Sequence, residues 1–105
     1  MYGLRHADID WMQALFKKYP SIEQVLIFGS RAVGRYRTGS DVDLALLGNG
    51  ITPAIAREIK MLLEEESPMP YFFDVVRYDG IADLVFKSKI DLEGKSIYNS
   101  SKTIV

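Results

Sequence analysis

The sequence predicts a single α/β domain, and three observations lead to this fold class. The chain has 105 residues, of which 48% are hydrophobic, and this is enough for one compact core. No Pro-, Gly- or Ser-rich linker divides the chain, so the expected domain spans residues 1–105. Segments with helical spacing of apolar residues alternate with short apolar runs that are typical of buried strands.

The first expected element is a helix. Asp8 is a suitable N-cap, and Pro20 ends the helical pattern. Its apolar residues recur at the spacing of one helix face: Ile9, Met12, Leu15 and Phe16.

Two strands should follow. Residues 25–28 form a short, fully apolar run, which predicts a buried strand, and a short helix is expected after Ser30. The second strand should begin at Asp41 and run through Leu47, because charged and apolar side chains alternate at its start with a period of two.

The second half predicts a helix, a strand and a last helix. Thr52 is a good N-cap and Pro53 is preorganised for the first helical position. Residues 69–76 are rich in aromatic and β-branched side chains, which favours a strand with Asp74 in its middle. The last helix should run from about residue 80 to 93. The residues expected to face the core are Ile55, Ile59, Leu62 and Leu63 in the helix that begins at Thr52-Pro53, and Ile81, Leu84, Val85 and Ile90 in the last helix.

The turn after the first strand suits a phosphate group. Gly29 allows a sharp turn and leaves room for a phosphate to approach the backbone, while Ser30 adds a hydroxyl donor. A helix beginning there would present free N–H groups and the positive end of its dipole. Taken alone, a Gly-Ser turn is most often purely structural.

Three carboxylates are candidate metal ligands. Asp41 and Asp43 are expected on one face of a strand, where a divalent cation would offset their repulsion, and such hard oxygen ligands suit Mg²⁺. Asp74 would converge on the same ion if its strand lay beside theirs. The alternatives are a solvated strand edge for Asp41 and Asp43 and an exposed edge position for Asp74.

Together these features resemble a known family. Gly29-Ser30, the intervening loop and Asp41-x-Asp43 resemble the signature of the polymerase-β-like nucleotidyltransferase superfamily. Residues 29–44, GSRAVGRYRTGSDVDL, are similar to its minimal nucleotidyltransferase (MNT) branch. The resemblance implies a nucleotidyltransferase fold, in which helices flank a small mixed β-sheet.

The resemblance also implies roles for individual residues. Asp41, Asp43 and Asp74 would be the catalytic residues and would hold two Mg²⁺ ions, or Mn²⁺ in their place, with ATP as the substrate. Asp74 would in addition activate the attacking hydroxyl. The implied nucleotide-binding residues are Gly29, Ser30, Arg31 and Ser40. Arg31 would either reach a phosphate or hold the carboxylates apart, and a surface ion pair is the alternative.

The implied partner is a helical protein of the HEPN type. The expected reaction is transfer of AMP from ATP to a hydroxyl of that partner, with tyrosine as the acceptor, which would silence it as an antitoxin does. The first alternative is a non-catalytic module that neutralises the partner by binding; a phosphate-sensing regulator is the second. A chain this short needs a partner, or self-association, to complete its cleft, with Tyr71–Phe73 or Arg35–Arg37 as contacts.

Composition excludes several classes of protein. The formal net charge of −1 disfavours binding of a long nucleic acid. The absence of cysteine fits a reducing cytoplasm. The N-terminus lacks a hydrophobic signal core, and no run of about 18 apolar residues occurs, so we expect a cytoplasmic protein without a membrane role.

Overall fold

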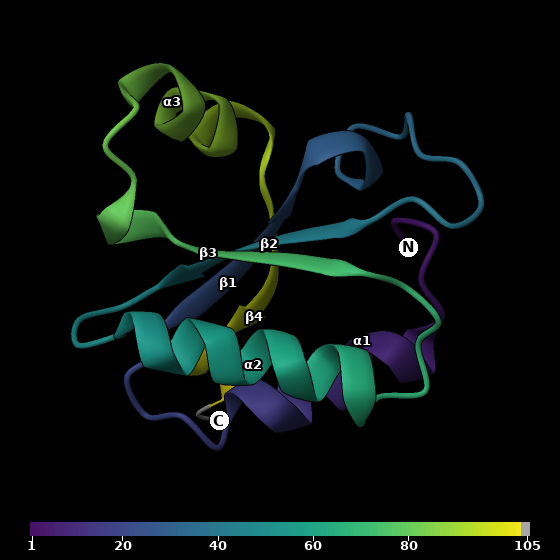
Figure 1. Cartoon of the computed structure of the whole chain (residues 1–105), viewed down its shortest axis with the longest axis horizontal. Coiled ribbons are helices and arrows are strands. Elements are labelled where there is room, and N and C mark those ends of the chain that lie inside the picture. Colours follow the sequence, from purple (N-terminus) through teal and green to yellow (C-terminus); the bar gives the residue numbers. More distant parts are fainter. Residues whose placement is uncertain (104–105) are drawn as a thin grey trace.

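The computed structural model describes residues 1–103 and contains one four-stranded sheet with helices on both faces (Figure 1). The strand order is β3-β2-β1-β4. Strand β1 runs antiparallel to β2 and β4, whereas β2 and β3 are parallel. This mixed sheet flanked by helices confirms the predicted fold class. The strands are β1 (Gln24–Phe28), β2 (Val42–Leu47), β3 (Phe73–Arg77) and β4 (Lys95–Asn99).

Helices α1 (His6–Phe16) and α2 (Pro53–Glu65) lie along one face of the sheet, and α3 (Leu84–Glu93) lies on the other (Figure 1). Helix α2 connects β2 to β3 and thereby allows these strands to be parallel. Within residues 1–103, no helix is long and apolar enough to cross a membrane. Short 3₁₀ turns follow three of the strands: η1 (Gly29–Arg31), η2 (Tyr78–Gly80) and η3 (Ser100–Thr103).

The two-residue period of β2 divides its side chains between two cores. Ala45 packs with Phe28 and Ile90 beneath α3. Asp43, two residues before Ala45, therefore belongs to the α3 face of the sheet. The alternate residues are buried in the main core against α1 and α2: Val42, Leu44 and Leu46.

Helix α2 begins as its sequence predicts. The Thr52 hydroxyl accepts a hydrogen bond from the Ile55 N–H at 3.2 Å, and Pro53 occupies the first helical position. Ile59 and Leu63 are fully buried against the sheet.

Asp8 is not the N-cap of α1, and that prediction was wrong. The helix begins at His6 and ends at Phe16, so Asp8 lies within its first turn. The Asp8 carboxylate accepts a hydrogen bond from the Arg5 N–H at 3.0 Å and pairs with the Arg5 guanidinium at 2.9 Å. These bonds hold the pKa of Asp8 below its ordinary value, although the residue is buried.

Helix α3 also differs from its prediction. It begins at Leu84 because the Asp83 carboxylate accepts from the N–H groups of Val85 and Phe86 and acts as N-cap. Leu84 and Val85 are 74% and 80% exposed, whereas they were expected to face the core. Ile90 is buried as expected, and Ile81, which precedes the helix, is partly buried against the same small core.

One of the two remaining strands is displaced from its predicted position, and the other was not predicted. The strand expected over residues 69–76 begins at Phe73 and extends to Arg77. Residues 95–99 form β4, which the sequence pattern did not predict, and this strand pairs with β1 through an irregular register.

The opposite exposure of Leu63 and Leu84 predicts opposite responses to truncation. Leu63→Ala should lower the free energy of unfolding by about 2–5 kcal/mol, because it leaves a cavity in the main core. Leu84→Ala should change it by less than about 0.5 kcal/mol. Urea unfolding measures both values, and equal losses would contradict the orientation of α3.

Candidate active site

The pairing of β1 with β2 brings Asp43 against the turn that follows β1. Phe28 and Asp43 are directly opposed in the antiparallel register, and Gly29 is the next residue along the chain. A Cβ atom on Gly29 would lie 2.2 Å from Asp43 Oδ2, and Gly29 has a φ of +72°. Glycine is therefore required here both by the left-handed backbone and by the close approach of the carboxylate.

The parallel register of β2 and β3 aligns Asp43 with Asp74. Both side chains lie on the α3 face of the sheet, since directly paired residues share a face. Asp74 is exposed on the edge strand β3, as in the alternative considered for it, and it nevertheless lies beside Asp43. Asp41 precedes β2 instead of beginning it and is also exposed, whereas Asp43 is half-buried.

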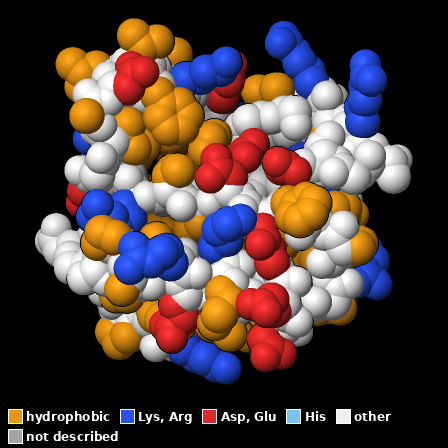
Figure 2. All heavy atoms as spheres, viewed as in Figure 1, with side chains coloured by type: hydrophobic (Ala, Val, Ile, Leu, Met, Phe, Trp, Pro, Cys, Tyr) orange, Lys and Arg blue, Asp and Glu red, His pale blue; other side chains and the backbone are white. Residues whose placement is uncertain are grey.

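The three carboxylates affect one another electrostatically. Partial burial of Asp43, followed by the charges of Asp74 and then Asp41, raises the pKa of Asp43 to about 6 from its ordinary value of 3.8. The positive charge of Arg31 acts in the opposite direction and lowers it. Figure 2 shows acidic side chains gathered on this face, between α3 and the loop that leads from η1 to β2.

This arrangement fits a cation that keeps several water molecules as ligands. Within residues 1–103, no three His, Cys, Asp or Glu side chains form a ready-made metal cage. Mg²⁺ keeps several water molecules and is commonly held by one or two carboxylates together with substrate phosphates. The hard oxygen donors of Asp41, Asp43 and Asp74, and the charge repulsion at Asp43, suit this mode of binding.

The helical segment predicted after the Gly29-Ser30 turn is shorter than expected. Gly29–Arg31 form a single 3₁₀ turn and no α-helix follows, so the expected helix dipole is largely missing. The Ser30 hydroxyl has no hydrogen-bond partner within residues 1–103 and is only partly buried. Ser30 and the backbone of the turn therefore remain the available donors beside Asp43.

Arg31 and Ser40 make contacts that the sequence did not predict. Arg31 is buried and makes no ion pair with residues 1–103; its guanidinium donates to backbone carbonyls, two of them at Ser40 and Asp41. The Ser40 hydroxyl accepts a hydrogen bond from the Arg37 N–H at 2.8 Å and closes a turn. The Arg31 guanidinium is thus engaged by the backbone, whereas the Ser40 hydroxyl, which accepts here, can still donate its proton to a ligand. Both sets of contacts order the loop before Asp41.

A small recess next to Gly29 was not predicted. It lies between the η1 turn and α3, on the same face of the sheet as Asp43, and its walls are mainly apolar. Among its α3 residues only Ile90 was expected from the sequence, as a residue facing the core. The lining residues are Phe28, Gly29, Phe86, Lys89, Ile90 and Glu93.

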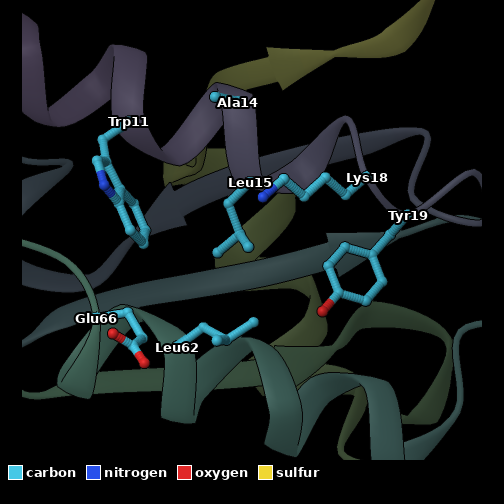
Figure 3. A pocket seen from close by; sticks show the side chains of 7 residues that line it. All are labelled: Trp11, Ala14, Leu15, Lys18, Tyr19, Leu62 and Glu66. Carbon is cyan, nitrogen blue, oxygen red and sulfur yellow. The ribbon is translucent and has the colours of Figure 1, made fainter.

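A second groove lies between α1 and α2, on the opposite face of the sheet (Figure 3). Leu15 and Leu62 extend toward each other across it, and the Tyr19 phenol donates to Glu58 on α2. Burial and this bond raise the pKa of Tyr19 to about 12. The groove lies on the face of the sheet opposite Asp43 and Asp74 and takes no part in the candidate site.

The chain belongs to the nucleotidyltransferases. The family model described as "Polymerase beta, Nucleotidyltransferase" matches residues 11–103. The resemblance predicted from residues 29–44 is thus confirmed at the level of the family. A comparison with curated proteins finds no match.

Solved structures of toxin-antitoxin systems share the fold. A chain of a toxin-antitoxin crystallised with AMP-PNP is 21% identical, with a TM-score of 0.73, over 95% of this chain and 77% of that one. A chain of the toxin-antitoxin MntA-HepT is 17% identical, with a TM-score of 0.70, over 94% and 76%. A third belongs to a tri-AMPylated Shewanella oneidensis HEPN toxin in complex with MNT antitoxin, at 17% identity and a TM-score of 0.71, over 95% and 76%.

Replacing Gly29 should separate stability from metal binding. Gly29→Ala and Gly34→Ala both place a side chain at a positive φ, and each should cost about 1 kcal/mol of stability. At Gly34 the added methyl group meets open space, whereas at Gly29 it would displace the Asp43 carboxylate. We expect only Gly29→Ala to weaken Mn²⁺ binding, measured by titration. Equal Mn²⁺ affinities in the two variants would contradict the proposed contact.

The raised pKa of Asp43 predicts a pH-dependent stability. An acid whose pKa is raised by folding favours the native state at low pH, and this contribution is lost as pH rises from 3.8 to about 6. In metal-free buffer, Asp43→Asn should therefore stabilise the protein at about pH 7.5 and have a smaller effect at about pH 4.5. Urea unfolding at both values tests this, and a pH-independent difference would argue against the electrostatic coupling.

Proposed function

We propose that this protein is a Mg²⁺-dependent nucleotidyltransferase that transfers AMP from ATP to a tyrosine hydroxyl of a helical HEPN-type partner and silences it as an antitoxin. The observation that carries the proposal is the placement of Asp43 against the Gly29 turn and beside Asp74. This placement puts the acidic residues of the chain next to the turn that suits a phosphate. The chain also belongs to the polymerase beta-type nucleotidyltransferases.

The carboxylates have distinct positions in this scheme. Asp41, Asp43 and Asp74 would hold two Mg²⁺ ions, whose chemistry when bound is to withdraw charge from phosphate oxygens and acidify a hydroxyl. Asp43 is half-buried at the centre, between the Gly29 turn and Asp74. Asp74 is exposed on the edge strand, where it can accept the proton of an incoming acceptor hydroxyl.

The reaction exchanges one phosphorus–oxygen bond for another. The acceptor oxygen forms a bond to the α-phosphorus of ATP, the bond to the β-phosphate oxygen breaks, and pyrophosphate leaves. Ser30 and the backbone of the η1 turn would orient the β- and γ-phosphates for this displacement. ATP as the substrate agrees with the cytoplasmic location expected from the sequence.

Two of the structures that share the fold support the choice of nucleotide and partner. One contains AMP-PNP, and another contains a HEPN toxin that carries three AMP groups together with an MNT antitoxin. In this chain, exposed apolar side chains on α3 and just before β3 offer contacts for a protein acceptor. They are Phe72, just before β3, and Leu84, Val85 and Leu92 on α3.

The alternative is neutralisation by binding alone. The same exposed apolar side chains favour it, because a surface of this kind can hold a partner whether or not the carboxylates act. Self-association of the chain through these residues is the second way to complete the cleft. The carboxylate arrangement favours the enzyme over both alternatives.

Mass spectrometry of a HEPN-type partner after incubation with ATP and Mg²⁺ tests the proposed reaction. We expect added AMP on a tyrosine with the wild-type protein and none with Asp41→Asn, Asp43→Asn or Asp74→Asn. Because these residues act on one cluster, their losses should be strongly non-additive. Ser30→Ala should have a milder effect, since the backbone donors of the turn remain.

Asp79→Asn is the matched control, because Asp79 is an exposed acid in the η2 turn, outside the carboxylate cluster. It should transfer AMP at the wild-type rate. Undiminished AMP addition by Asp43→Asn would refute the catalytic role. A partner that is neutralised without any added AMP would establish the binding alternative.

A further inference from the structure

Arg31 is the most deeply buried basic side chain of the site. It is 2% exposed, although it directly follows the Gly29-Ser30 turn. Its Nε and Nη2 atoms donate to the Ser40 carbonyl at 3.1 and 2.7 Å, and Nε also lies 3.3 Å from the Asp41 carbonyl. The guanidinium therefore fixes the backbone of the loop at the point where it delivers Asp41 to the site.

The same guanidinium contacts the segment that leads to Asp74. Its Cζ atom lies 4.4 Å from the centroid of the Tyr71 ring and 5.4 Å from that of Tyr36. These distances fall within the range of cation–π contacts. Tyr71 precedes Asp74 by three residues, so one side chain joins the η1 turn, the Asp41 loop and the approach to β3.

The N-terminal segment closes over this cluster. The Tyr2 carbonyl accepts a hydrogen bond from Arg31 Nη1 at 3.0 Å. Gly3, at a φ of +72°, passes so close that a Cβ atom there would lie 2.7 Å from Nη1 and 2.5 Å from the Tyr36 ring. The charge of Arg31 is thus enclosed by carbonyl groups and aromatic rings, with no carboxylate bonded to it among residues 1–103.

We propose that Arg31 is a positioning residue that sets Asp41 and Asp74 relative to the Gly29-Ser30 turn, and that it does not bind phosphate. The planar guanidinium can donate to three carbonyls while its faces stack on rings. A lysine ammonium supplies the same charge without that geometry, so charge and geometry can be separated by experiment. The kinetic part of the test rests on the proposed transferase activity; the structural part does not.

The structural part uses amide hydrogen exchange of the free protein. The Arg37 and Ser40 amides are bonded within the loop that Arg31 holds, to the Ser40 hydroxyl and the Arg37 carbonyl, respectively. In Arg31→Lys we expect both amides to exchange about tenfold faster or more, while the exchange of α2 is unchanged. Arg35→Lys is the matched control, because Arg35 is exposed in the same loop, and it should leave both rates unchanged.

The kinetic part uses AMP transfer. Misplacement of reacting groups by about 1 Å can cost on the order of 100-fold in rate. Arg31→Lys should therefore lower kcat by about tenfold to 100-fold and change the KM for ATP by less than about threefold. If Arg31 bound phosphate instead, the KM for ATP would rise and lysine would largely preserve activity.

Gly3→Ala provides a second perturbation if Arg31 variants do not fold, because it crowds the same guanidinium from outside. It should also accelerate Arg37 and Ser40 exchange and lower kcat. Unchanged exchange in Arg31→Lys, or in Gly3→Ala where the former does not fold, would overturn the proposal. So would full rescue of kcat by lysine. Absence of any transfer by the wild-type protein would instead refute the proposed function, and the exchange result would still decide the role of Arg31.

Discussion

The contact between Asp43 and Gly29 is the constraint on which the site depends. It arises because β1 and β2 pair with Phe28 opposite Asp43, which places the carboxylate where any side chain at Gly29 would lie. A slip of one residue in this register would turn Asp43 into the main core and expose Leu44. The buried residues Val42, Leu44 and Leu46 therefore fix the position of the acid as well as the stability of the sheet.

The site is held together by interactions that do not neutralise it. Partial burial of Asp43, together with the negative charges of Asp74 and Asp41, raises the pKa of Asp43, and this rise is a cost to the folded protein at neutral pH. Arg31 offsets only part of this charge, because its donors are directed to backbone carbonyls. A protein that tolerates such repulsion gains a strong electrostatic preference for a cation, and stability is commonly given up in this way for function.

The sequence predicted those parts of the fold that follow from local patterns. The apolar run before Gly29, the Thr52-Pro53 helix start and the period of two around Asp43 all produced the expected elements. Residues whose roles depend on distant contacts were mispredicted. Leu84 and Val85 were expected to face the core, yet α3 packs against the sheet through Phe86 and Ile90, so both are exposed.

Dependence on contacts distant in sequence also limited what could be predicted of the site. The approach of Asp43 to the Gly-Ser turn and to Asp74 could be predicted from the order of these residues, because it follows from the pairing of neighbouring strands. The burial of Arg31 could not, since it depends on Tyr2 and Tyr71, which are far from it in sequence. The most direct test of the central claim is the melting temperature with and without millimolar Mg²⁺ and ATP. We predict a clear rise for the wild-type protein and none for Asp43→Asn; an unchanged melting temperature in a well-folded wild-type sample would contradict the shared-cation site.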